Sequence, residues 1–211
     1  MRLVEYSFFH RGGSTLNPRG FTSLFVAGFL AATAVGCHAG PPDPHSIRGA
    51  LSYAAQAIEA HDAERLFRVI DQRARHAMAS IVTSRVEAKQ LIEADYPENE
   101  RAAALAALGD GAQVKTPAEL FGKRCPEACM AELGARLAAP RAEENAGADV
   151  VVHTARGGVL HMHAGNDGWF GLVWNTEALV EERAQAAREL EQIRENASVY
   201  RKQRELAKTA K

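Results

Sequence analysis

The stretch DVVVHTARGGVLHMHAGNDGWFGLVW, residues 149–174, decides the fold class. Its β-branched and aromatic runs are separated by the turn sequences RGG and GND, which is typical of a three-stranded antiparallel meander. A segment around residues 137–143 could add a fourth strand. Both faces of the last run are apolar, so we expect it to be covered on both sides, with Trp169 and Trp174 as packing anchors.

Helical patterns lie on both sides of this meander. Upstream, Ser46, Asp62, Ser84 and Thr116 each precede apolar residues at helical spacing and are predicted to cap helices. Downstream, residues 176–207 contain neither Gly nor Pro and are predicted to form one helix. The predicted fold is therefore α+β, with N-terminal helices packed on a small three- to four-stranded antiparallel sheet and followed by a long C-terminal helix.

One face of that last helix carries an apolar seam whose members alternate at spacings of four and three: Ala186, Leu190, Ile193, Ala197 and Tyr200. We expect this seam to bind a protein partner or a second copy of the chain. The tail from Arg201 onward is basic. It either complements the negative end of the helix dipole or contacts anionic lipid heads or another acidic surface.

The apolar run FTSLFVAGFLAATAVGC, residues 21–37, indicates location. Arginines precede it, and it is shorter than the roughly 20 apolar residues of a membrane span, so it is typical of a secretory signal. Ala34-Val35-Gly36-Cys37 resembles the lipobox of bacterial lipoproteins. That resemblance implies cleavage before Cys37 and acylation of its thiol, with palmitate among the acyl chains.

A lipidated Cys37 would anchor the protein to a membrane of the bacterial cell envelope, facing the periplasm. His38 is not the Asp that often retains such proteins at the inner membrane, which favours the outer membrane. An ordinary signal peptide cut near Ala39, an uncleaved anchor and a cytosolic chain are the alternatives. The membrane contact is therefore expected through a lipid anchor.

These boundaries divide the chain into a signal peptide (1–36), a Pro/Gly linker (37–45), an α+β domain (46–175) and a C-terminal helix with a basic tail (176–211). The whole chain has 25 basic and 26 acidic side chains. Removing residues 1–36 takes away three Arg and one Glu and leaves 22 basic and 25 acidic side chains, a net charge of −3. This balance gives no reason to expect a nucleic acid partner.

Cys125 and Cys129 form a C-x3-C pair in a compartment that we expect to be oxidising. Pro126 between them would distort a regular helix, so a disulfide that staples a turn is the favoured interpretation. A redox-active or metal-binding pair and two free thiols are the alternatives.

His161 and His163 are the leading candidates for chemistry. Separated by one residue on a strand, they share a face at about 6–7 Å, which suits two ligands of one divalent metal. A tight turn with an even residue count would place His153 on the opposite face of the sheet, whereas a three-residue loop at 156–158 would place it directly opposite His161 as a third ligand. Acid–base work in a pocket, or solvated histidines on a half-exposed sheet face, are the alternatives. No cofactor is expected.

The pattern A-x-x-A-I-E-A-H-D-A-E-R-L-F at residues 54–67, with D-G-W at 167–169, resembles the NTF2-like or SnoaL-like superfamily. That resemblance implies a curved sheet wrapped against helices around a pocket. Four side chains could line such a cavity as proton donors or bases: Tyr53, Asp71, Asp95 and Tyr96. Surface and helix-capping roles are the simpler interpretation for all four.

The sequence therefore predicts a lipid-anchored envelope protein that acts as a binding or interaction module rather than as an enzyme. An NTF2-like small-molecule binder or enzyme, and a metal binder through His161 and His163, are the alternatives. The sequence contains no G-x-S-x-G, H-E-x-x-H or S-x-x-K motif and no phosphate-binding glycine loop.

Overall fold

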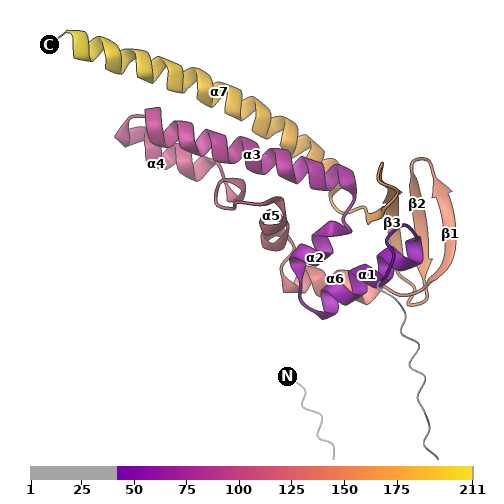
Figure 1. Ribbon diagram of the computed structural model, residues 1–211. Helices are drawn as coiled ribbons and strands as arrows, with labels where there is room; N and C mark the ends of the chain where they lie inside the picture. Colours follow the sequence, from indigo (N-terminus) through magenta and orange to yellow (C-terminus); the bar gives the residue numbers. More distant parts are fainter. Residues whose placement is uncertain (1–41, 211) are drawn as a thin grey trace, which may run out of the picture. The chain divides into compact units, whose positions relative to one another are not determined.

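The computed structural model describes residues 42–210 (Figure 1). The predicted signal peptide, the lipobox with Cys37 and the first part of the linker lie outside the described residues. The chain divides into two units, 1–38 and 39–211, and all described residues belong to the second. The second unit contains helices and a four-stranded antiparallel sheet in the order β1-β2-β3-β4, which confirms the α+β prediction.

Helices make up most of the described chain. The elements are, in chain order, α1 (Ile47–Glu59), α2 (Ala63–Arg68), α3 (Gln72–Asp95), α4 (Glu98–Ala107), the 3₁₀ turn η1 (Asp110–Ala112), α5 (Pro117–Arg124), α6 (Glu127–Arg136), β1 (Pro140–Ala146), β2 (Asp149–Thr154), β3 (Val159–Ala164), β4 (Phe170–Leu172) and α7 (Thr176–Thr209).

Local capping signals account for several helix starts. Ser46, Asp62 and Thr116 each accept a hydrogen bond from the backbone N–H three residues further on, so these predicted caps are confirmed. Ser84 is different, because it lies in the middle of α3, and the prediction of a helix start there was wrong. The apolar positions of α3 continue through Ser84, and the true cap is Asp71, whose carboxylate accepts from the second N–H beyond it.

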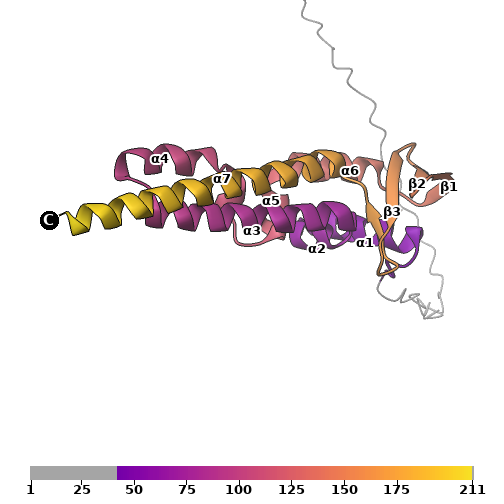
Figure 2. The same ribbon diagram turned by 90° about the horizontal axis from the view of Figure 1, so that it is seen from above.

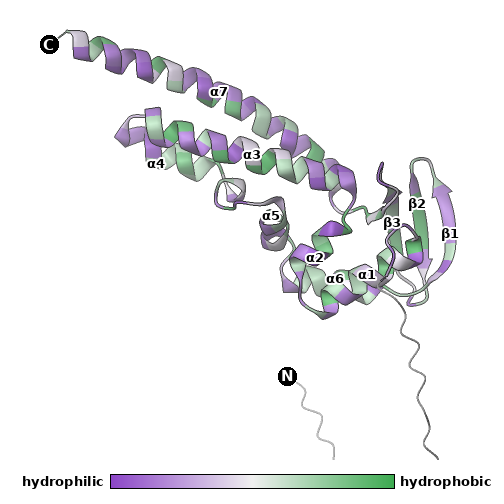
Figure 3. Cartoon of the chain, in the orientation of Figure 1, coloured by the Kyte–Doolittle hydropathy of each residue, from purple (hydrophilic) through white to green (hydrophobic). Residues whose placement is uncertain are grey.

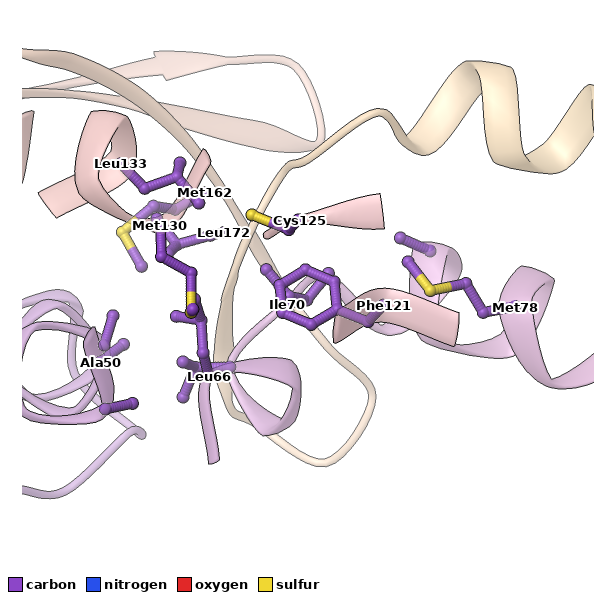
Figure 4. Packing of buried hydrophobic residues seen from close by; sticks show 14 of the residues in the cluster. Ala50, Leu66, Ile70, Met78, Phe121, Cys125, Met130, Leu133, Met162 and Leu172 are labelled. Atoms are coloured by element: carbon purple, nitrogen blue, oxygen red, sulfur yellow. The ribbon is translucent and has the colours of Figure 1, made fainter. Parts of the chain in front are cut away.

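One face of the sheet packs on the main hydrophobic core. Met162 and Leu172 are buried beside Met130 and Leu133 of α6, and Figure 4 shows these side chains meeting. The edge strand β1 is exposed and hydrophilic beyond Pro140, whereas β2 is apolar (Figure 3). A charged edge strand of this kind discourages pairing with other chains.

The short strand β4 is covered along its outer edge by the chain itself. The N–H of Leu172 donates to the carbonyl of Val69, and the N–H of Asp71 donates to the carbonyl of Leu172, both at 2.8 Å. A backbone bridge joins Ile70 to Leu172. The residues just before α3 therefore close the outer edge of β4.

Helices α3 and α7 run parallel, side by side (Figures 1 and 2). Asp71 contacts Thr176, and Asp95 contacts Arg201, so residue numbers rise together along the two helices. The apolar seam of α7 packs on α3 and α4 and forms a second core; its buried members include Ala88, Ile92, Leu108, Leu190 and Ala197. The seam that was expected to bind a partner is thus occupied within this chain.

Candidate functional site

Two adjoining grooves flank α1. The first, here called the β1 groove, has a volume of about 520 Å³ and is lined by residues that include Ile47, Arg48, Arg141, Ala142, Glu143 and Phe170. The second, here called the α6 groove, has a volume of about 670 Å³, and its lining includes Arg48, Leu51, Ile58, Glu59, Leu137 and Arg156. Arg48 lines both grooves, so they form a continuous surface along one side of the helix.

The helical repeat explains how α1 serves both the core and the grooves. Ala50 and Ala54 are buried in the main core. Arg48, Ser52 and Ala55 recur at spacings of four and three residues and therefore lie on one stripe, at the border of the buried face. Both grooves are lined by apolar as well as charged side chains.

Arg48 and Arg141 are exposed, and within residues 42–210 neither side chain forms a hydrogen bond or an ion pair. The guanidinium of Arg156 lies 3.4 Å from the carbonyl oxygens of Gly134 and Leu137, a long and weak contact. Each groove is also lined by one carboxylate, Glu143 in the β1 groove and Glu59 in the α6 groove. The guanidinium groups of Arg48 and Arg141 are thus without a partner among the described residues.

The described chain begins beside the β1 groove. The N–H of Phe170, which lines that groove, donates to the carbonyl of Pro44 at 2.9 Å. The ring of His45 meets the indole of Trp169 edge-on at 6.0 Å. The linker that leads from Cys37 therefore reaches the folded unit at the edge of β4.

Trp174 lies in an aromatic cluster of the main core. Its ring centroid is 5.1 Å from that of Phe121, which is in turn 5.8 Å from that of Phe67. Both tryptophans are half-buried and in ring contacts. Their role in this structure is packing.

The hairpin between β2 and β3 does not have the register that a metal site required. Its loop comprises residues 155–157 rather than 156–158, because the N–H of Thr154 donates to the carbonyl of Gly158. Gly157 has a φ of +77°, the left-handed conformation that closes three-residue hairpin loops. His153 therefore lies opposite Val159, not opposite His161, and the predicted arrangement was wrong.

The histidines of the exposed sheet face have separate partners. His163 Nδ1 lies 2.8 Å from a carboxylate oxygen of Asp149, and His153 Nε2 lies 3.3 Å from one of Glu144. His161, on the same face, lies opposite Val151. In the part of the chain that the structure describes, no group of three or more His, Cys, Asp and Glu side chains is placed to hold a metal ion.

Asp71 ties the starts of the two long helices together. It is fully buried, and its Oδ2 accepts from Arg73 Nε at 2.8 Å and from Thr176 Oγ1 at 3.1 Å. Arg73 also donates to Asp149 at 3.0 Å, so the network reaches His163 at the sheet. The sequence indicated Asp71 but not its contacts with Arg73 and Thr176. Only the capping position of Asp71 was visible in the sequence, because Thr176 is distant along the chain.

The cavity expected from the NTF2-like resemblance does not gather its four candidate residues. Asp71 and Asp95 lie at opposite ends of the 24-residue α3, which is about 36 Å long at 1.5 Å per residue. Tyr96 meets the ring of Tyr200 at 5.0 Å, and Tyr53 lies 4.8 Å under the guanidinium of Arg65. Each of the four has a local structural role.

Asp95 binds the basic tail. Its carboxylate accepts from Arg201 at 2.7 Å and also contacts Arg204. Hydrogen bonding from Arg201, followed by that from Arg204, lowers the pKa of the Asp95 carboxyl despite its burial. Two cations of the tail are thus used within the chain, which favours the structural interpretation of the tail over lipid contact.

Cys125 and Cys129 are joined by a disulfide, with their Cα atoms 5.0 Å apart. Cys125 ends α5 and is buried in the main core, and Cys129 lies in the first turn of α6. The bridge therefore staples the corner between these two helices.

The comparisons with known proteins give no family: no family model, no curated protein and no solved structure matches this chain. Within residues 42–210, no helix is both long enough and apolar enough to cross a membrane. The resemblances to bacterial lipoproteins and to the NTF2-like superfamily stay predictions.

Proposed function

We propose that this chain is a lipid-anchored binding module of the bacterial cell envelope, tethered at Cys37, whose binding surface is the pair of grooves along α1. The observation that carries this proposal is the pair Arg48 and Arg141, which line the β1 groove without any partner in residues 42–210. Guanidinium groups bind anionic oxygens strongly, often through two parallel hydrogen bonds.

Two further observations support the tethered arrangement. The described part of the chain begins at Pro42, only five residues after the lipobox cysteine. The described chain then reaches the fold at the edge of β4, where Phe170 is shared between the linker contact and the β1 groove. A ligand in that groove would therefore lie close to the anchor.

Acylation at Cys37 is tested in cells that produce the full chain. Radiolabelled palmitate should be incorporated into the wild-type protein and should be absent from Cys37→Ser. The variant should leave the membrane fraction or accumulate as the uncleaved precursor. A matched Cys125→Ser/Cys129→Ser variant should still be labelled. Equal labelling or identical processing and fractionation of wild type and Cys37→Ser would refute the anchor.

A further inference from the structure

We infer that the β1 groove binds the phosphate-bearing head group of an anionic phospholipid in the membrane to which the chain is anchored. This inference rests on the proposed function and names the ligand of the same surface. It combines three properties of the groove: its two cations without a partner in the described residues, its apolar lining residues and its position beside the linker.

The charge of the groove suits a phosphodiester. Arg48 on α1 and Arg141 on β1 line it from two different elements, and Glu143 is the only acidic side chain in its lining. A phosphate that contacts both guanidinium groups would gain charge-assisted hydrogen bonds. Because both side chains are exposed and have no partner in the described residues, binding would not require an internal ion pair to break.

The apolar residues that line the groove suit the apolar part of a lipid. Ile47, Ala142 and Phe170 line it together with the two arginines. A free inorganic phosphate would leave this apolar surface uncovered, whereas the glycerol and first methylenes of a phospholipid would cover it. This difference favours a lipid over a small anion.

Chain length places the groove within reach of the head groups. Five peptide units separate Cys37 from Pro42, and each extends at most about 3.6 Å, so the two Cα atoms are no more than about 18 Å apart. If Cys37 is acylated, the start of the folded unit is held that close to the bilayer surface. The C-terminal tail has no such constraint, and its Arg201 and Arg204 are engaged with Asp95.

Vesicle sedimentation tests this inference with residues 39–211, the compact unit that lacks the apolar leader. We expect this fragment to bind vesicles of phosphatidylcholine containing about 30% phosphatidylglycerol more tightly than pure phosphatidylcholine. A basic residue at an anionic surface contributes about a factor of five in affinity. The Arg48→Gln/Arg141→Gln variant should therefore bind the anionic vesicles about 30-fold more weakly.

The matched control removes the same charge elsewhere. Arg183→Gln/Lys202→Gln changes two exposed cations of α7 that have no ion pair in the described residues, and it should keep at least half of the wild-type affinity. An equal loss in both variants would show diffuse attraction and overturn the inference. Wild-type binding by the groove variant would also overturn it, as would displacement from the vesicles by about 10 mM inorganic phosphate at constant ionic strength.

A second measurement uses the full anchored chain in case the fragment does not fold, which circular dichroism would reveal. In full-length Trp174→Phe, the remaining indole Trp169 adjoins groove residue Phe170. Brominated phosphatidylglycerol should quench it more than brominated phosphatidylcholine does, and Arg48→Gln/Arg141→Gln should remove that difference. Equal quenching by both lipids would overturn the inference. Palmitate labelling separates this failure from failure of the anchor.

Discussion

Replacement of Asp71 by Ala should destabilise the protein more than any other single capping change. Asp71 is fully buried and accepts hydrogen bonds from the backbone N–H of Arg73, from its guanidinium and from the hydroxyl of Thr176. Loss of a helix cap costs about 1 kcal/mol, and a buried hydroxyl without a partner costs about 1–3 kcal/mol. The guanidinium of Arg73 is partly exposed and would still form its ion pair with Asp149, so the loss of its ion pair with Asp71 should add little to the destabilisation.

These contributions give an expected loss of roughly 3 kcal/mol in the free energy of unfolding. For a domain of this size, each kcal/mol lowers Tm by about 2–4 °C, so Asp71→Ala should lower Tm by roughly 6–12 °C. Urea unfolding followed by circular dichroism measures the free energy, and a thermal scan measures Tm.

Two variants make this test specific to the junction of α3 and α7. Asp62→Ala removes an exposed N-cap with no long-range partner and should cost about 1 kcal/mol. Thr176→Val should cost about 1–2 kcal/mol alone, and much less in the Asp71→Ala background, because the two side chains are coupled. The reasoning is refuted if Asp71→Ala costs no more than Asp62→Ala, or if the losses of Asp71→Ala and Thr176→Val simply add.

Three further outcomes follow from other contacts. The pKa of Asp95 is lowered in the folded state, so its carboxylate should stabilise the fold fully above about pH 5 and lose this contribution as the pH falls below about 4. The difference in Tm between wild type and Asp95→Asn should therefore shrink below about pH 4. A difference that stays constant with pH would contradict this. Reduction of the Cys125–Cys129 disulfide should cost about 2 kcal/mol, as expected for so short a loop, with Cys125→Ser/Cys129→Ser as the control insensitive to reductant. Gly158→Ala should lower the free energy of unfolding by about 2 kcal/mol or more, because the added Cβ would lie 2.5 Å from the carbonyl oxygen of Arg136. Gly122→Ala is the control, because its Cβ would meet only an ordinary contact. Equal Tm values for the two variants would contradict this account.

Local patterns in the sequence predicted most of the elements. Turn glycines and alternating apolar residues indicated the meander, and Ser46, Asp62 and Thr116 indicated helix starts, because each of these signals acts within a few residues of its effect. Ser84 misled the prediction because a capping residue type has no effect where the apolar helical pattern continues through it.

The sequence by itself determined the α+β class, the apolar run at residues 21–37 and the spacing of the cysteines, since these depend on short-range propensity and composition. Only the tertiary structure decided that the seam of α7 is buried on α3 and that His153 lies opposite Val159. It alone placed Arg48 and Arg141 in the lining of one groove. The physical reason is that helix partners, a one-residue hairpin register and contacts between distant segments depend on how whole elements pack, and no local pattern contains that information.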